Sequence, residues 1–545
     1  MFKPKELFLR AYPVPLSEFN LEDKDDQNII ACPKPPIEAV KAGKAISVPS
    51  GQFDVCVILK QLDDFQPELV NLSARNMNFI PRGLEKIKCP KVMKIGDTFH
   101  WGDGSLSGII NYCQTLQCDY HWVYQGVQHL HFFIEAGLKN VFWLPGTPVI
   151  HHYVPQKSTL KTYDIVFRGS QSELHVHRSR LLKFLQSSGV NIDIQKKPYI
   201  ECLEDYAKSQ IVFNCGLNGD TNRRVFEVLM AGGFLLTDRL TPQSGLFHLF
   251  QEGIHLECYG NEGELLEKIN FYLKNPDKAE QIALAGHQKL INCYNQQIIK
   301  QKFYRYIFKG EIEPIFLLEH DKRVLYTRQN RDEKKFNIRI KVYELIQEIH
   351  RLNPKIKLIY WKGKNKDLLS DIADLPRLEI TYFNSKDAII GVDDWCAKVG
   401  IKEQVHLQCL LSDHQFQIVL VDLPNTLTTL KKLFFEVELL VAESGLLLLV
   451  GNKPNKIKEF FINWLARLRG FVSINLFVEN RQQQLGIGAC FVFQKLPKRD
   501  SVYSIAIEPK LFVNSFNNPA KLRMQLSSLP LIVQMKKSVK NLLSS

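Results

Sequence analysis

Short apolar runs, rich in β-branched and aromatic residues, alternate with helix-like segments along most of this chain. Three such runs are YDIVFRGS at 163–170, IVFNCG at 211–216 and FLLTD at 234–238. Helical patterns such as HRSRLLKFLQSS separate them. Strands that alternate with helices form parallel sheets covered by helices, because each parallel connection needs a crossover. The sequence therefore predicts an α/β fold class built from several Rossmann-like units.

Composition narrows the class of protein. The 545 residues are 45% hydrophobic and 23% charged, which is typical of folded domains and excludes a disordered chain. Lys plus Arg number 70 against 57 Asp plus Glu, so the net charge of +13 favours anionic partners. The basic residues are dispersed and no RNA or DNA motif occurs, so we expect no nucleic-acid partner. Twelve cysteines without zinc-ligand spacing predict no metal site.

The ends of the sequence indicate where the protein works. The N-terminal stretch MFKPKELFLRAYPVPL has no long apolar core and no small-residue cleavage site, and no stretch reaches about 18 uncharged apolar residues. We expect a cytoplasmic protein. The C-terminal LPLIVQMKKSVKNLLSS is basic and partly amphipathic, so it fits either peripheral contact with an anionic inner membrane face or an ordinary packed helix.

Changes in pattern along the chain suggest the domain organisation. Strands are expected at 53–60, 91–97, 119–125 and 140–146 in the first block, and a Pro-containing stretch at 147–161 reads as a linker. The predicted parts are a first Rossmann-like domain (1–155), a second (156–310), a charged connector (311–337), a third Rossmann-like domain (338–500) and a basic tail (501–545).

The most informative segment is IVFNCGLNGDTNRRVFEVLMAGGFLLTDR at 211–239. A strand ends at Asn214, a polar loop follows, and a helix carries Arg224 and Glu227 three residues apart. Strand carboxyl ends and helix N-termini meet at the edge of a parallel sheet where ligands bind. An arginine there suits a diphosphate, and a carboxylate one turn further suits a ribose diol. The alternative is a plain intrahelical ion pair between Arg224 and Glu227.

RRVFEVLMAGGFLLTDR, followed by GLFHLFQEGIHLECYGNEGELLEKINFYLKNPDKAEQIALAGHQKLI, resembles the nucleotide-binding half of GT-B glycosyltransferases. The group it resembles is the CgeB-like one of glycosyl transferases family 1, over roughly 50–310. The resemblance implies two Rossmann-like domains in a GT-B arrangement. It further implies metal-independent transfer of a hexosyl or related sugar from a nucleotide-diphosphate donor to a hydroxyl acceptor (a glycan, a lipid-linked acceptor or a protein). A bacterial cell-surface glycan is the product it suggests.

The resemblance also implies which residues bind the donor. Glu227 matches the glutamate that holds the donor ribose, and Arg224 the arginine near the diphosphate. The full predicted donor set is Arg168, Gly169, Asn214, Asp220, Arg223, Arg224, Glu227 and Gly232. The stretch 293–308 fits a final helix that crosses back to the first domain. Retaining relatives carry another glutamate eight positions before Glu227, where this chain has Gly219, so the stereochemical outcome stays open.

The first domain would then bind the acceptor. In IGDTFHWGDGS (95–105), His100 is the predicted catalytic base and Asp97 its orienting carboxylate, because histidine accepts protons near neutral pH. The alternative is a polar turn at a strand end. His129, His131, His151 and His152 are expected to be structural or linker residues.

The third block resembles the methyltransferase variant of the Rossmann fold. FQIVLVDLPN and ESGLLLLVG resemble that family's fourth and fifth strands, with Asp422 at the end of the fourth, and the last two strands (471–479 and 487–494) could pair as an antiparallel hairpin. The glycine turn expected for S-adenosylmethionine has only Gly363, and Asn384 replaces an acidic residue. We therefore predict a degenerate domain and no required cofactor. Two alternatives remain: a binding or scaffold protein, and a bifunctional glycosyl- and methyltransferase.

Overall fold

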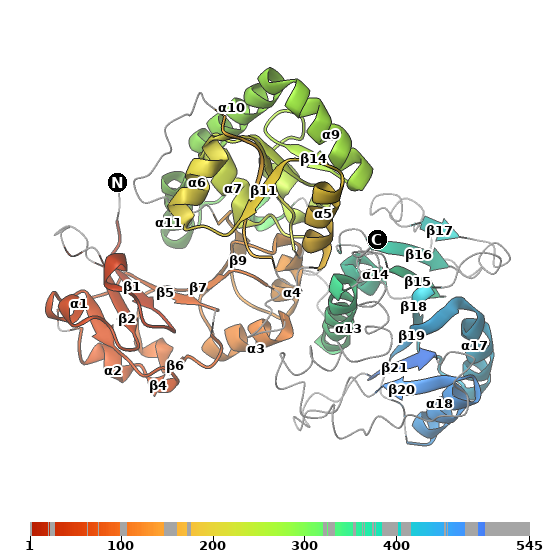
Figure 1. Cartoon of the computed structure of the whole chain (residues 1–545). Helices are drawn as coiled ribbons and strands as arrows, with labels where there is room; N and C mark the ends of the chain where they lie inside the picture. The colour runs from red at the N-terminus through yellow and green to blue at the C-terminus, as the bar shows by residue number, and fades with distance from the viewer. Residues whose placement is uncertain are drawn as a thin grey trace. The chain divides into compact units, whose positions relative to one another are not determined.

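Three large sheets follow one another along the chain in a computed structural model (Figure 1). The described residues are 3–19, 21, 28–62, 64–74, 76–98, 106–146, 161–171, 176–217, 219–319, 324, 333–352, 356–361, 363, 366–372, 375, 378–383, 402–404, 416–451, 454, 456–474 and 489–495. The first two sheets lie in one compact unit and the third lies in another. The expected domain boundaries stay predictions, and the tail 501–545 lies outside the described residues. Within the described part of the chain, no helix is both long and apolar enough to span a bilayer.

The first sheet is parallel throughout. Its strands, in spatial order, are β3 (Ala45–Ser47), β2 (Ile29–Cys32), β1 (Glu6–Leu9), β5 (Leu69–Ser73), β7 (Lys91–Ile95), β8 (Tyr120–Val123) and β9 (Val141–Trp143). Its helices include α1 (Ile37–Lys41), α3 (Leu106–Leu116) and α4 (Leu130–Glu135). The strand order reverses between β1 and β5, as in doubly wound folds.

The strand expected at 53–60 is wrong. Only its start is extended, in β4 (Gln52–Asp54), which pairs with β6 (Ile80–Arg82) in a separate two-stranded sheet. The chain then turns into the short helix α2 (Cys56–Leu59). The Asp54 carboxylate accepts the backbone N–H of Cys56 at 2.8 Å, which favours a turn at the point where a continued strand was expected.

The second sheet is parallel, in the order β11 (Ile192–Gln195), β10 (Tyr163–Arg168), β12 (Ser209–Phe213), β13 (Leu235–Asp238) and β14 (Glu257–Tyr259). The helices along this part of the chain are α5 (Val176–Ser187), α6 (Tyr199–Ala207), α7 (Arg223–Met230), α8 (Leu246–Leu249), α9 (Glu262–Lys274) and α10 (Pro276–Cys293). This strand order reverses direction between β10 and β12, which marks the usual ligand position in such sheets.

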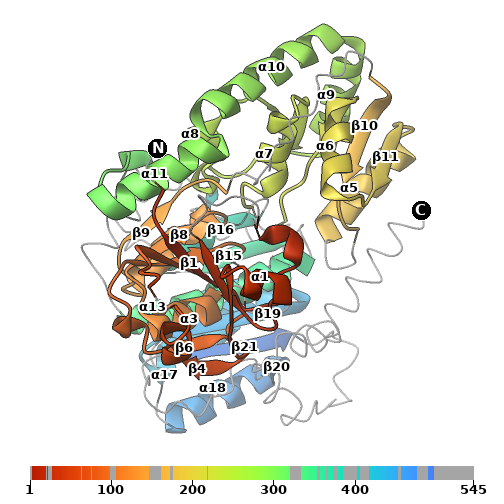
Figure 2. The same ribbon diagram turned by 90° about the vertical axis from the view of Figure 1, so that its left-hand side faces the viewer.

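The next helix, α11 (Gln296–Lys309), returns to the first sheet (Figure 2). Phe303 packs on Trp122 with ring centroids 4.9 Å apart, and Tyr306 packs edge-on against Phe142 at 4.8 Å. The Tyr304 hydroxyl bonds the buried carboxylate of Glu6 in β1. The crossing expected for 293–308 is therefore confirmed, and aromatic packing stabilises it.

The third sheet has the order β17 (Lys402–Gln404), β16 (Glu379–Phe383), β15 (Lys357–Trp361), β18 (Phe416–Asp422), β19 (Val441–Gly451), β21 (Ala489–Lys495) and β20 (Phe471–Ile474). Its helices include α13 (Glu333–Leu352), α14 (Lys366–Ile372), α17 (Leu427–Leu440) and α18 (Lys456–Leu468). β21 runs antiparallel to both of its neighbours, β19 and β20, so the expected antiparallel pairing of the last two strands is confirmed. The strand expected at 405–411 lies outside the described residues.

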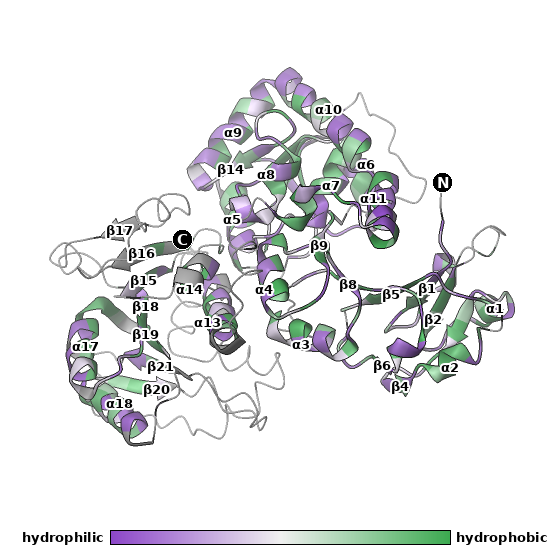
Figure 3. Ribbon diagram, turned by 180° about the vertical axis from the view of Figure 1, so that it is seen from behind, coloured by the Kyte–Doolittle hydropathy of each residue, from purple (hydrophilic) through white to green (hydrophobic). Residues whose placement is uncertain are grey.

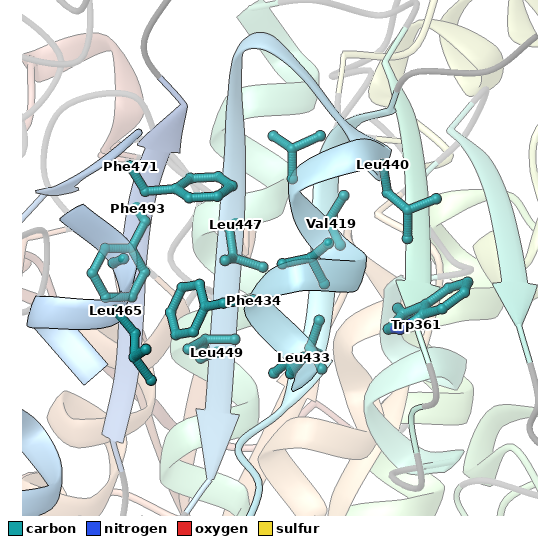
Figure 4. Close-up of a cluster of buried hydrophobic side chains, with 14 of the residues drawn as sticks. Trp361, Val419, Leu433, Phe434, Leu440, Leu447, Leu449, Leu465, Phe471 and Phe493 are labelled. Atoms are coloured by element: carbon teal, nitrogen blue, oxygen red, sulfur yellow. The ribbon is translucent and has the colours of Figure 1, made fainter. Parts of the chain in front are cut away.

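The core of the third sheet lies between its strands and helices α17 and α18 (Figure 4). Phe434 of α17 is fully buried and packs edge-on against Phe471 and Phe493, at centroid distances of 6.3 and 6.0 Å. Leu447 and Leu449 of β19 lie in the same cluster. Such burial is the main favourable term in folding. The predicted α/β fold class with three Rossmann-like sheets is confirmed.

Candidate functional site

The candidate site lies at the carboxyl edge of the second sheet, at the reversal between β10 and β12. Arg224, in the first turn of α7, bridges the two strand ends. Its Nη1 donates to Asn214 Oδ1 at 2.8 Å, and its Nη2 donates to the Arg168 carbonyl. The guanidinium also lies over the Phe167 ring, 4.6 Å from the centroid. One side chain thus fixes the geometry of the edge where parallel sheets bind ligands.

Gly169 allows this bridge to form. A Cβ at this position would lie 2.4 Å from Arg224 Nη2. Any side chain there would displace the guanidinium from the strand ends. The predicted donor-binding glycine therefore shapes the site by leaving room for Arg224.

Asn214 is the centre of a buried hydrogen-bond network. Its side-chain amide donates to Thr237 Oγ1 at 3.0 Å, and it exchanges hydrogen bonds with the Asn222 amide at 3.2 and 3.3 Å. The Tyr259 hydroxyl donates to its carbonyl at 2.9 Å. Asn214 is only 1% exposed, so these partners replace water. The network joins β12, β13, β14 and the start of α7 into one fixed edge.

The loop before α7 is held on both sides. The Gly216 amide donates to Asp238 Oδ1 at 2.8 Å, and Thr221 Oγ1 donates to the Ser244 carbonyl at 2.9 Å. Asp220 lies buried in this loop, between Gly216 and the helix start. The loop is therefore pinned to β13 and to the turn at 242–244.

Arg224 forms no ion pair among the described residues. Both of the groups that accept its guanidinium hydrogen bonds, Asn214 Oδ1 and the Arg168 carbonyl, are neutral oxygens. Its Nε is buried and has no hydrogen-bond partner in that part of the chain. A partly buried cation of this kind attracts an anionic ligand strongly, because little water screens it.

Glu227 pairs with Arg223, one turn earlier, at 2.8 Å between Oε1 and Nε. The intrahelical pair considered between Arg224 and Glu227 is therefore wrong: the neighbouring arginine is the partner. Burial raises the pKa of Glu227, although the positive charges of Arg223 and Arg224 act against that rise. The Arg223 guanidinium also covers the Tyr199 ring at 4.8 Å. The second turn of α7 thus presents a single, mostly buried acid.

Arg168 is not available to a donor, so that prediction is wrong. Its Nε bonds Asp205 Oδ2 at 2.5 Å, and its Nη2 bonds Asp193 Oδ2 at 2.6 Å. Its Nη1 donates to the Asp193 carbonyl at 2.9 Å, and the side chain has no exposed area. The guanidinium is a structural cross-link between β10, β11 and α6. Only the carbonyl of Arg168 takes part in the site, through Arg224.

Gly232 is also misassigned. It follows the C-terminal end of α7, about 12 Å of helix from the first turn. Its φ of +71° is the left-handed conformation that terminates helices and favours glycine. Gly232 therefore ends the helix and lies away from the carboxyl edge of the second sheet, which holds Asn214 and Arg224.

The predicted base cannot be placed, because His100 lies outside the described residues, as do His151 and His152. Asp97 is exposed just beyond the end of β7. Beside it, Thr98 Oγ1 lies 2.6 Å from Nδ1 of His129, which is fully buried. His131 is buried as well. Among the described residues no group of three or more His, Cys, Asp or Glu could hold a metal ion.

The carboxyl edge of the third sheet is occupied by an aromatic side chain. The Tyr360 hydroxyl of β15 donates to Asp422 Oδ1 of β18 at 2.6 Å, across the reversal of strand order. A Cβ on Gly363 would lie 2.2 Å from the Tyr360 ring. Asn384 lies outside the described residues. The Tyr360–Asp422 contact thus lies at the reversal of strand order, near which ligands usually bind in such sheets.

Several residues in and around the candidate site were not predicted from the sequence. Asn222 precedes α7 and is a favoured residue type at a helix start, which could have singled it out. Thr237 and Tyr259 lie in stretches that carry the family resemblance, a strand ending in Thr-Asp and a later stretch ending in Tyr, but their contacts with Asn214 are long-range and gave no sequence signal. Arg239 was also passed over: it pairs with Glu252 and Glu264, at 2.6 Å to each. These pairs tie the end of β13 to the start of α9.

Replacing Arg168 with Met should destabilise the fold. The change removes the positive charge that pairs with Asp193 and with the buried Asp205. Lys197 still pairs with Asp205 at 2.7 Å. We expect a loss on the order of 3 kcal/mol in the free energy of unfolding. The control Arg305→Met removes an exposed pair with Glu311 and should cost below about 1 kcal/mol. Urea denaturation followed by circular dichroism measures both. Normal stability with weaker nucleotide binding would return Arg168 to the donor site.

The pairing of Glu264 with Arg239 predicts that the folded protein becomes less stable at low pH. Hydrogen bonds from Arg239 hold the pKa of Glu264 at about 2, below the ordinary value of 4.5. Because the folded-state pKa is the lower one, the stabilisation is complete above pH 4.5 and disappears as pH falls toward 2. The stability difference between wild type and Glu264→Gln should therefore shrink over this range. Thermal unfolding at pH 6, 4 and 3 tests it, and a constant difference would contradict it.

Comparison with known proteins shows which families and solved structures this chain is similar to. A family model described as glycosyl transferase-like matches residues 168–301. Similar solved structures include HepE from Anabaena in complex with UDP and glucose (13% identity, TM-score 0.40, 56% of this chain and 100% of that one). Sucrose-phosphate synthase from Thermosynechococcus elongatus is 11% identical over 56% of this chain and 100% of that one, with a TM-score of 0.39. TarM from S. aureus is 14% identical over 47% of this chain and 59% of that one, with a TM-score of 0.32.

At these identities and scores the solved structures carry no inference about activity. No curated protein sequence matches significantly. The family match covers the candidate site at the carboxyl edge of the second sheet, including Asn214, Arg224 and Glu227. Residues 168–301 are therefore similar to the glycosyl transferase-like family.

Proposed function

We propose that the first two domains form a glycosyltransferase that moves a hexosyl or related sugar from a nucleotide-diphosphate donor to a hydroxyl acceptor. The observation that carries this proposal is the guanidinium of Arg224, which forms no ion pair in the described part of the chain, at the reversal point of a parallel sheet. The same position lies inside the glycosyl transferase-like match. A nucleoside diphosphate would supply a negative charge that pairs with Arg224.

The residues suggest how the reaction would be assisted. Breaking the sugar–phosphate bond leaves growing negative charge on the diphosphate, and Arg224 would stabilise it. The N–H groups at the start of α7 point toward the same edge. The mostly buried Glu227 would accept hydrogen bonds from the ribose hydroxyls. With the charge offset in this way, we propose that the transfer needs no metal.

We propose that the first domain binds and activates the acceptor. We propose that His100 removes the proton from the acceptor hydroxyl and that Asp97 orients it. The acceptor would be a glycan, a lipid-linked acceptor or a protein, and the product a bacterial cell-surface glycan made on the cytoplasmic side. A histidine base at this position predicts activity that falls as pH drops below the histidine pKa.

Arg224→Ala should weaken donor binding. Losing a charged hydrogen bond to a diphosphate lowers affinity roughly 10- to 100-fold. Titration calorimetry against UDP, GDP, dTDP and their sugars measures this, and the same panel reports transfer or hydrolysis. Arg305→Ala is the matched control, because its guanidinium is 64% exposed and pairs with Glu311. If the wild-type chain binds no nucleotide and Arg224→Ala changes nothing, the protein is a binding or scaffold protein instead.

For the third domain we propose a role without methyl transfer. The supporting observation is the buried Tyr360 hydroxyl on Asp422, at the edge where a cofactor would sit. The expected result is no heat when S-adenosylmethionine is titrated into the full chain. Tyr360→Phe should not create binding, because the ring remains. Saturable binding of S-adenosylmethionine by the wild-type chain would instead support the bifunctional alternative.

A further inference from the structure

Helix α18 is apolar on two different faces. Ile462, Leu465 and Ala466 lie in the core of the third sheet. Phe460, Trp464 and Leu468, however, are 66%, 48% and 61% exposed. Because these three recur every four residues, they form one stripe along the outer surface of the helix. An ordinary surface helix has a polar outer face, so this stripe calls for a partner.

The stripe continues onto neighbouring elements. Leu439 at the end of α17 is 57% exposed and Val472 of β20 is 39% exposed. The Arg469–Glu438 pair, at 3.1 Å, joins the ends of α18 and α17 beside these residues. Phe460, Trp464, Leu468, Leu439 and Val472 are together called the outer patch. In the described part of the second unit they are all the large hydrophobic side chains that are exposed. Exposed large apolar side chains gathered on neighbouring elements in this way mark an interaction site.

Basic residues border the outer patch. Arg467 is exposed next to Leu468, and Lys432 is exposed two turns before Leu439 on the same face of α17. Of the nearby acids, Glu438 is already paired with Arg469. Glu459 is the exposed carboxylate on α18. The rim therefore carries an excess of positive charge, as does the whole chain at +13.

Figure 3 shows hydrophobic and hydrophilic residues alternating along α18, on the outside of its unit. A tryptophan and a phenylalanine with cations beside them match the layer where lipid headgroups meet acyl chains. Aromatic rings are stable at this depth, and Lys and Arg reach the lipid phosphates. A protein partner would not specifically require this pairing of aromatic stripe and basic rim.

We propose that the outer patch docks on a membrane that contains anionic lipids. Phe460, Trp464 and Leu468 enter the headgroup region, and Arg467 and Lys432 bind the phosphates. This surface belongs to the third domain and is independent of the proposed sugar transfer. It gives that domain a role that needs no catalytic site.

The experiment is cosedimentation of the full chain with vesicles of phosphatidylcholine alone or with phosphatidylglycerol. The wild type should bind the anionic vesicles and bind the neutral ones weakly. The combined Phe460→Ser, Trp464→Ser and Leu468→Ser variant should bind at least about 10-fold less. Phe271→Ser with Leu284→Ser is the control, because these side chains are 42% and 45% exposed in the first unit. Equal binding by the triple variant and the wild type would overturn the proposal.

Two further measurements separate other occupants of the patch. Lys432→Glu with Arg467→Glu should lose binding to anionic vesicles while the outer patch stays intact, and unchanged binding would contradict the proposed lipid contact. A chain ending at residue 500 should keep binding, whereas loss there together with normal binding by the triple variant would assign the contact to the tail. Light scattering measures oligomeric state. If the wild type is a dimer, the triple variant a monomer and vesicle binding absent, the patch joins two copies and the proposal fails.

Discussion

The contact between Arg224 and the ends of β10 and β12 is the interaction on which the candidate site depends. Parallel strands bring their carboxyl ends to one edge, but each end is followed by a loop free to diverge. Arg224 binds the Arg168 carbonyl and Asn214 together, and Gly169 leaves room for it. The carboxyl edge of the second sheet is therefore set before any ligand binds, which would lower the entropic cost of binding the proposed donor.

Much of the fold could be predicted because its strands are continuous apolar runs. The sequences VLVD at 419–422 in the third sheet and FLLTD at 234–238 in the second sheet belong to strands that are buried on both faces. Such continuous apolar runs are easily recognised as strands in a sequence. The first sheet was harder. Glu6 in β1 and Asn71 in β5 interrupt the apolar pattern, and each is satisfied by a long-range partner: Asn71 donates to Glu6 at 2.7 Å, and Tyr304 bonds Glu6 from α11. No local pattern reveals such a contact.

The candidate site was predictable in position but only partly in detail. The strand–loop–helix pattern located Asn214 and Arg224, which do lie together. Spacing could not decide which arginine pairs with Glu227, because offsets of three and four residues both share a helix face. The burial of Arg168 was also hidden, since its partners lie 25 and 37 residues away. Sequence shows which groups are charged, whereas tertiary contacts decide which charges are already used.

That distinction explains what the positive charge of the chain can do. Arg168 and Arg239 are each balanced by two carboxylates, so their charges stabilise the fold and attract little else. Among the described residues Arg224 hydrogen-bonds neutral oxygens and forms no ion pair, so its field extends into the site. The same criterion applies to the outer patch, where Arg469 is paired with Glu438 but Arg467 is exposed beside an apolar stripe. The proposed anionic ligands, a diphosphate at one site and lipid phosphates at the other, would therefore bind where a cation forms no ion pair within the described part of the protein.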